Sequence, residues 1–99
     1  YKVFYITLSD ILREYLWRQF GVDATADTSA ELLRRDKNMP QMAPFMYQLR
    51  DFLSSGDLVK FAKAVPSEQI RDKDVKILRE IIIETAPKEL SPAAREDEA

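Results

Sequence analysis

The stretch LSDILREYLWRQFG, Leu8 to Gly21, decides the fold of this chain. When its residues are placed at 100° steps, apolar side chains gather on one face, which is typical of an amphipathic helix that packs on a core. The pattern extends upstream, so we predict one helix from Lys2 to Phe20, ended by a glycine that fits the left-handed position after a helix. Its predicted core-facing residues are Phe4, Leu8, Ile11, Leu12, Tyr15 and Leu16.

This helix has no capping residue at its start. The sequence begins at Tyr1 rather than at a methionine, and no serine, threonine or aspartate precedes the helical pattern. We therefore expect the chain to be a piece of a longer protein. No apolar run in it approaches the ~20 residues that cross a bilayer, so a membrane anchor or a signal would lie in the remaining part.

The composition is that of one small globular domain. The 99 residues are 45% hydrophobic and 32% charged, and they include neither cysteine nor histidine. This excludes thiolate and imidazole metal sites, and Ser-His or Cys-His nucleophile pairs, within these residues. With only two glycines, a glycine-rich phosphate loop is excluded as well. We therefore predict no catalytic residue, no cofactor and no metal site.

The net charge of −2 is localised at the end of the chain. Residues 88–99 hold four acidic and two basic side chains, a proline and few apolar groups, so we predict a disordered acidic tail after a helical domain of residues 1–87. The remaining body is balanced in charge. It offers no gross basic patch of the kind that nucleic acid or anionic lipid favours.

Four further regions carry helix signals after residue 27. Thr28 and Glu31 form a capping box, so we predict that a helix starts at Ser29. This helix is expected to end before Pro40, with a solvated basic cluster near its end. Its inward residues are predicted to be Ala30, Leu32 and Leu33, and its basic cluster is Arg34, Arg35 and Lys37.

The next helix is predicted from Gln41 to Ser54, with Pro44 in its first turn and Gly56 as its stop. Its core face comprises Met42, Phe45, Met46, Leu49, Phe52 and Leu53. The two methionines fit core filling, or alternatively an adaptable binding groove. Tyr47 points away from this face.

A short helix capped by Asp57 and a last helix from Ser67 to Thr85 complete the prediction. The inward residues of the short helix are predicted to be Leu58, Phe61, Ala62 and Val65. Those of the last helix are predicted to be Ile70, Ile77, Leu78, Ile81 and Ile82. Asp74 lies on the same face, so either the first turns fray or the carboxylate finds a donor across the bundle. The expected fold is all-α, a small bundle of four to five helices, with residues 2–20 at its centre.

Trp17 breaks the pattern of the first helix because it projects nearly opposite the apolar face, beside Ile6, Asp10 and Arg13. In one interpretation, the terminal segment or a neighbouring helix covers this tryptophan. In the other it is a contact site for a protein partner, since tryptophan and arginine are enriched at binding hot spots. We take these four residues, with Tyr47 as a second surface aromatic, as the candidate partner-binding residues.

Two other functional classes remain open as alternatives. A helix-turn-helix DNA-binding regulator fits the domain size and the short turn expected before residue 41, although the recognition helix would carry one arginine, Arg50, beside the acidic Asp51. A hydrolytic enzyme would need a deep cleft lined by carboxylates with shifted pKa values.

Three segments resemble a known family: FYITLSDILREYL with FGV at residues 4–16 and 20–22, TSAELL at 28–33, and DLVKFAK followed by PS at 57–63 and 66–67. Together they resemble the cytoplasmic helical region of bacterial membrane proteins of the Bat (aerotolerance) type. These proteins are encoded beside MoxR-type AAA+ ATPases and von Willebrand factor A domain proteins. The resemblance implies a non-enzymatic contact module on the cytoplasmic face of the inner membrane, anchored through a segment outside this chain. It also implies these ATPases or von Willebrand factor A proteins as partners.

Overall fold

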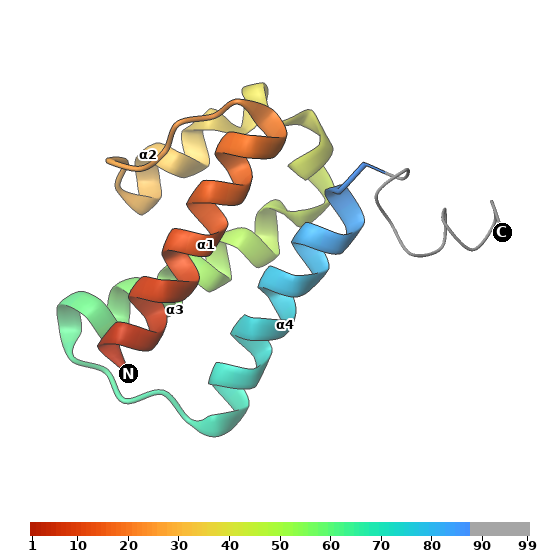
Figure 1. Cartoon of the computed structure of the whole chain (residues 1–99). Coiled ribbons are helices and arrows are strands. Elements are labelled where there is room, and N and C mark those ends of the chain that lie inside the picture. Colours follow the sequence, from red (N-terminus) through yellow and green to blue (C-terminus); the bar gives the residue numbers. More distant parts are fainter. Residues whose placement is uncertain (88–99) are drawn as a thin grey trace, which may run out of the picture.

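The computed structural model describes residues 1–87, which form an all-α bundle (Figure 1). The α-helices are α1 (Lys2–Phe20), α2 (Ser29–Leu33), α3 (Met46–Ala62) and α4 (Glu68–Thr85). Two 3₁₀ segments, η1 (Arg34–Asn38) and η2 (Pro40–Phe45), join α2 to α3. The expected all-α class is thus confirmed, while the acidic tail predicted for residues 88–99 lies outside the described residues.

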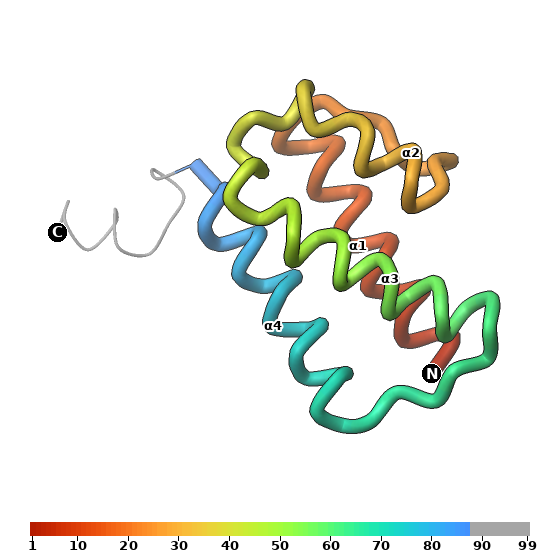
Figure 2. Tube along the Cα trace, turned by 180° about the vertical axis from the view of Figure 1, so that it is seen from behind, coloured from red at the N-terminus to blue at the C-terminus, as the bar shows by residue number. Residues whose placement is uncertain are grey.

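The three long helices form the body of the bundle (Figures 1 and 2). α1 and α4 run in the same direction, and α3 runs the opposite way, packed on both. α3 also touches α2 and η2, so it occupies the central position that the sequence suggested for residues 2–20. None of the helices in residues 1–87 has the length and apolar character needed to span a membrane.

The first helix begins and ends as predicted, but its core face is rotated. Gly21 adopts the left-handed conformation with φ 68°, which confirms the predicted stop. The buried residues of α1 are Tyr5, Leu8, Ser9, Leu12 and Leu16. Phe4 and Ile11 were predicted inside and are exposed. Apolar side chains surround this helix on several sides, so periodicity alone could not identify which of them meet α3 and α4.

The segment after residue 27 starts as the predicted α-helix and then changes to 3₁₀ turns. Both hydrogen bonds of the Thr28 and Glu31 capping box are present. The α-helix ends at Leu33, however, and the chain continues in 3₁₀ turns in place of the longer helix predicted up to Pro40. Ala30, predicted inward, is exposed, because so short a helix buries one narrow side, centred on Leu32.

The predicted start of the next helix, over residues 41–45, is also 3₁₀, with Pro44 inside it. Proline has no N–H to donate to the preceding turn, and its ring crowds that turn, so a regular α-helix is disfavoured here. Twelve residues of 3₁₀ and irregular chain, 34–45, therefore separate α2 from α3. The short turn expected between them, on which the helix-turn-helix hypothesis rested, is not present.

α3 continues through Gly56, where a stop was predicted. Gly56 is buried, and a Cβ built on it would lie 3.7 Å from Cδ1 of Tyr5, so α1 packs directly over this turn. Asp57 consequently lies inside the helix and caps nothing. The helix ends instead at Ala62, followed by Lys63 in the left-handed conformation with φ 57°.

The continuous helix changes which residues of this region are buried. Val59 packs in the core. The four residues predicted inward are exposed: Leu58, Phe61, Ala62 and Val65. The turn of 100° per residue places Phe61 and Leu58 away from the side defined by Gly56 and Val59, and this explains the error.

The last helix confirms most of its prediction. Ser67 caps α4 by accepting from the N–H of Ile70, and Ile77, Leu78 and Ile81 are buried. Asp74 is fully buried and accepts a 2.6 Å hydrogen bond from the hydroxyl of Tyr5, so the donor across the bundle exists and the first turns stay helical. Ile70, predicted inward, is exposed because it lies in the first turn of α4, at the edge of the bundle.

Candidate functional site

Three of the predicted contact residues line one hollow on the outer face of α1. Asp10, Arg13 and Trp17, together with Glu14 and Thr25, enclose about 400 Å³. Trp17 is 56% exposed, so neither the 22–28 connection nor a neighbouring helix covers it. The hollow thus presents an aromatic surface beside charged groups of both signs.

Arg13 fixes one wall of this hollow. Its guanidinium donates to the backbone carbonyl oxygens of Ala24 and Asp27, the latter at 2.8 Å, and to the hydroxyl of Ser9 at 3.0 Å. These bonds tie the 22–28 connection to α1. Arg13 therefore shapes the hollow, and its hydrogen-bonding capacity is largely used within the domain.

An ion pair also holds the same connection. The Arg35 guanidinium donates to both carboxylate oxygens of Asp27, at 2.5 and 3.1 Å, and this contact lowers the pKa of Asp27 below its ordinary value. The connection is thus fastened to α1 by Arg13 and to η1 by Arg35. The rim beside Trp17 is consequently a fixed surface, which lowers the entropy lost when a partner binds.

The other two predicted residues lie elsewhere. Ile6 shares the outer face of α1 but does not line the hollow. Tyr47 is 81% exposed on α3, as predicted for a surface aromatic, and lines separate hollows with Arg50. The structure therefore brings together three of the five predicted residues.

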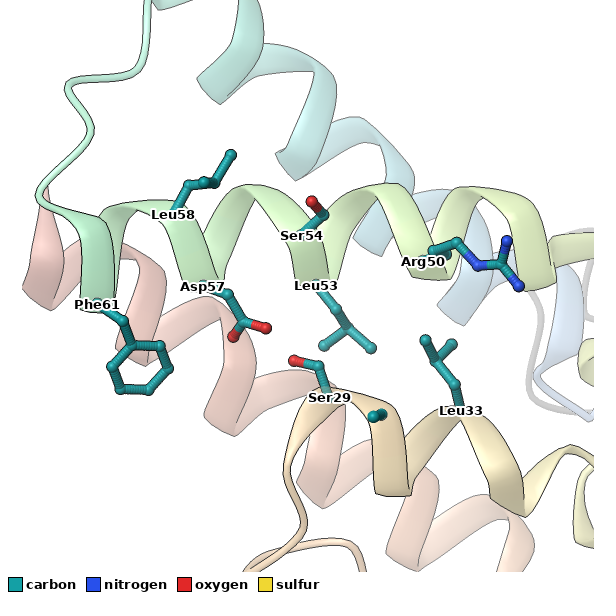
Figure 3. A pocket seen from close by; sticks show the side chains of 9 residues that line it. Ser29, Leu33, Arg50, Leu53, Ser54, Asp57, Leu58 and Phe61 are labelled. Carbon is teal, nitrogen blue, oxygen red and sulfur yellow. The ribbon is translucent and has the colours of Figure 1, made fainter.

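A groove between α2 and α3 is a surface that the sequence interpretation missed (Figure 3). It encloses about 340 Å³. Leu33 of α2 and Leu53 of α3 point into it from its two walls, and Phe61, 79% exposed, closes one end. Its lining residues are Ser29, Ala30, Leu33, Arg50, Leu53, Ser54, Asp57, Leu58 and Phe61.

Charged side chains stand along the α3 wall of this groove. Asp57 points toward Ser29 of α2, and Arg50 lies near the opposite end, beyond Leu33 (Figure 3). The sequence held a signal for this surface: if α3 is drawn as one helix, Arg50, Asp57 and Phe61 share a face. Reading Gly56 as a stop separated the first of these residues from the other two.

The interior holds one polar pair, Asp74 and Tyr5, whose pKa values are shifted by burial. Burial raises the pKa of the Asp74 carboxyl and also that of the Tyr5 phenol that donates to it. Both groups are enclosed by the helices, so they act on stability rather than on a substrate. In the part of the chain that the structure describes, no three metal-ligating side chains lie close enough to hold an ion.

The two surfaces, the Trp17 hollow and the α2–α3 groove, are formed by different elements and present different chemistry. Both are shallow, open and flanked by charges, which is typical of protein contact surfaces. The chain matches no protein-family model, no curated protein and no solved structure.

Proposed function

We propose that this domain is a non-enzymatic protein-interaction module of a membrane-anchored bacterial protein, positioned on the cytoplasmic face of the inner membrane. The observation that carries the proposal is the exposure of Trp17 on a rigid rim. A tryptophan side chain left in water on a fixed surface is the residue type that most often dominates binding energy at an interface.

The geometry around Trp17 supports this use. The indole stands next to Asp10, an exposed carboxylate, and to Thr25, a hydroxyl on the connection that Arg13 holds. A partner would bury the ring and find a hydrogen-bond acceptor and a donor at its edge. This combination of an apolar anchor with a polar rim is the usual anatomy of a specific interface.

The family resemblance supports the identity of the partners. Residues 4–16, 28–33 and 57–63 resemble proteins encoded beside MoxR-type AAA+ ATPases and von Willebrand factor A domain proteins. We propose one of these two as the protein bound at the Trp17 hollow, within an envelope-associated assembly.

Binding of the purified domain to a purified MoxR-type ATPase and to a von Willebrand factor A domain protein, measured by calorimetry, tests the proposal. Trp17→Ala should weaken binding about 30-fold, the effect of losing a hot-spot residue of about 2 kcal/mol. Ile11→Ala is the matched control, because Ile11 is also an exposed apolar residue of α1 but lies outside the hollow. Unchanged affinity in Trp17→Ala would refute the site, and failure of both proteins to bind would refute the partners.

A further inference from the structure

The α2–α3 groove combines apolar walls with two opposite charges. Leu33 and Leu53 form its walls, and Phe61 closes one end. Arg50 and Asp57 are seven residues apart on α3, which places them about 10.5 Å apart along the helix and within about 20° of the same face. Neither makes an ion pair within residues 1–87.

The dimensions of the groove indicate what binds there. A volume of 340 Å³ is near the lower limit for pockets that enclose a small ligand. Because the groove lies open along the surface of α3, it suits side chains projecting from a larger partner (Figure 3). From Arg50 to Phe61 the wall extends over eleven residues, or about 16 Å, which matches three turns of a helix.

The all-helical structure of residues 1–87 favours a helix, rather than a β-strand, as the partner segment in the groove. The described residues contain no β-strand, so a partner strand would find no sheet edge to pair with. A helix satisfies its own backbone hydrogen bonds and needs only apolar anchors that repeat every three or four residues. Laid along the groove, it would place anchors against Leu33, Leu53 and Phe61.

We propose that the α2–α3 groove binds an amphipathic helix of a partner protein, whose apolar anchors are flanked by one acidic and one basic residue seven positions apart. The acidic residue faces Arg50 and the basic residue faces Asp57, so the order of the two charges in the partner sequence sets the direction in which the helix lies. This proposal deepens the proposed interaction function, and it uses a surface that excludes Trp17.

The test selects binders from a displayed library of fourteen-residue helical peptides with leucine fixed at positions 4, 8 and 11 and the flanking positions randomised. Against the 99-residue chain, the enriched peptides should carry an acidic and a basic residue seven apart in one preferred order. Against the double variant Arg50→Glu with Asp57→Lys, the opposite order should be enriched. Enrichment without such a pair, without reversal, or no enrichment at all would overturn the proposal.

Matched variants then locate the site. Phe61→Ser should weaken binding of an enriched peptide at least tenfold, and Arg50→Glu about fivefold, as expected for one surface charge pair. Val65→Ser is the control, because Val65 is 78% exposed, nearly as much as Phe61, but does not line the groove. Equal losses in Phe61→Ser and Val65→Ser would overturn the assignment of the groove.

Two further measurements separate this proposal from its alternatives. Trp17→Ala should bind the selected peptides with unchanged affinity, so a failure at the groove and a failure at the Trp17 hollow are distinguishable. Sedimentation equilibrium of the free chain should show a monomer. A dimer that Phe61→Ser dissociates would mean that a second copy of this chain fills the groove, which would overturn the partner helix.

Discussion

Asp74→Asn is expected to make the domain progressively more stable than the unmodified chain as the pH rises. Asp74 is fully buried, its Oδ2 accepts from Tyr5, and its Oδ1 has no hydrogen-bond partner within residues 1–87. Burial raises the pKa of this carboxyl above its ordinary value of 3.8, against the hydrogen bond from Tyr5, which lowers it. Asparagine has nearly the same shape, still accepts from Tyr5 and carries no charge to desolvate.

The sign and size of the effect follow from proton linkage. Below pH 3.8 the carboxyl is protonated in both the folded and the unfolded chain, and the full stability is present. Between 3.8 and the higher folded pKa, the unfolded chain loses its proton first. The free energy of unfolding therefore falls by up to about 1.4 kcal/mol per pH unit in that window. In the Asp74→Asn variant the side chain does not ionise, so this fall in the free energy of unfolding does not occur.

Urea unfolding followed by circular dichroism between pH 4 and pH 8 measures the difference between the two chains. Taking the difference cancels the contributions of the other carboxylates, such as Asp27, whose lowered pKa values act in the opposite direction. Tyr5→Phe provides a second variant: without the donor, the Asp74 carboxylate is less stabilised and the loss should extend to higher pH. A difference between Asp74→Asn and the unmodified chain that stays flat or shrinks as pH rises would refute the reasoning.

Three other substitutions test the packing around the two surfaces. Gly56→Ala should raise the melting temperature, because alanine is about 1 kcal/mol better in a helix and its methyl group would sit at ordinary contact distance from Tyr5; a lower melting temperature would contradict this. Thr28→Ala should cost about 1 kcal/mol in urea unfolding through loss of the capping box, and an unchanged midpoint would show that the cap contributes nothing. Arg13→Met keeps the aliphatic stem and removes the hydrogen bonds to the 22–28 connection. It should cost about 1.5 kcal/mol and accelerate amide hydrogen exchange in that connection, whereas unaltered protection there would mean that other contacts hold it.

The helix boundaries that the sequence predicted well are those with a complete local signal. Gly21 follows an apolar pattern of five turns, and Thr28 with Glu31 forms both bonds of its capping box. Ser67 caps α4 with a single bond, in which its hydroxyl accepts from the N–H of Ile70. At such positions the backbone satisfies itself with nearby groups, so residue identity alone is enough to locate the boundary.

The errors arose where tertiary packing outweighed a local signal. Glycine followed by aspartate at residues 56–57 is a standard stop and restart, yet α3 continues through both residues, with Gly56 buried beside Tyr5 of α1. That single error hid the α2–α3 groove, since it predicted Phe61 to be buried. Trp17, in contrast, was correctly placed opposite the core face of an unbroken helix, and the structure answers the question that the sequence left open, since the side chain is exposed.

The parallel arrangement of α1 and α4 has a consequence for the order of folding. Tyr5 meets Asp74, Tyr15 meets Thr85 at 2.5 Å, and Gln19 donates to the carbonyl of Thr85, contacts that join residues 66 to 70 positions apart in the sequence. α3 and α4, in contrast, are joined by the five residues 63–67 and form an antiparallel hairpin. Since loop closure is entropically easier over short separations, this hairpin is expected to assemble first. α1, which precedes both in the chain, is then the last of the three to dock, and the core closes only when it does.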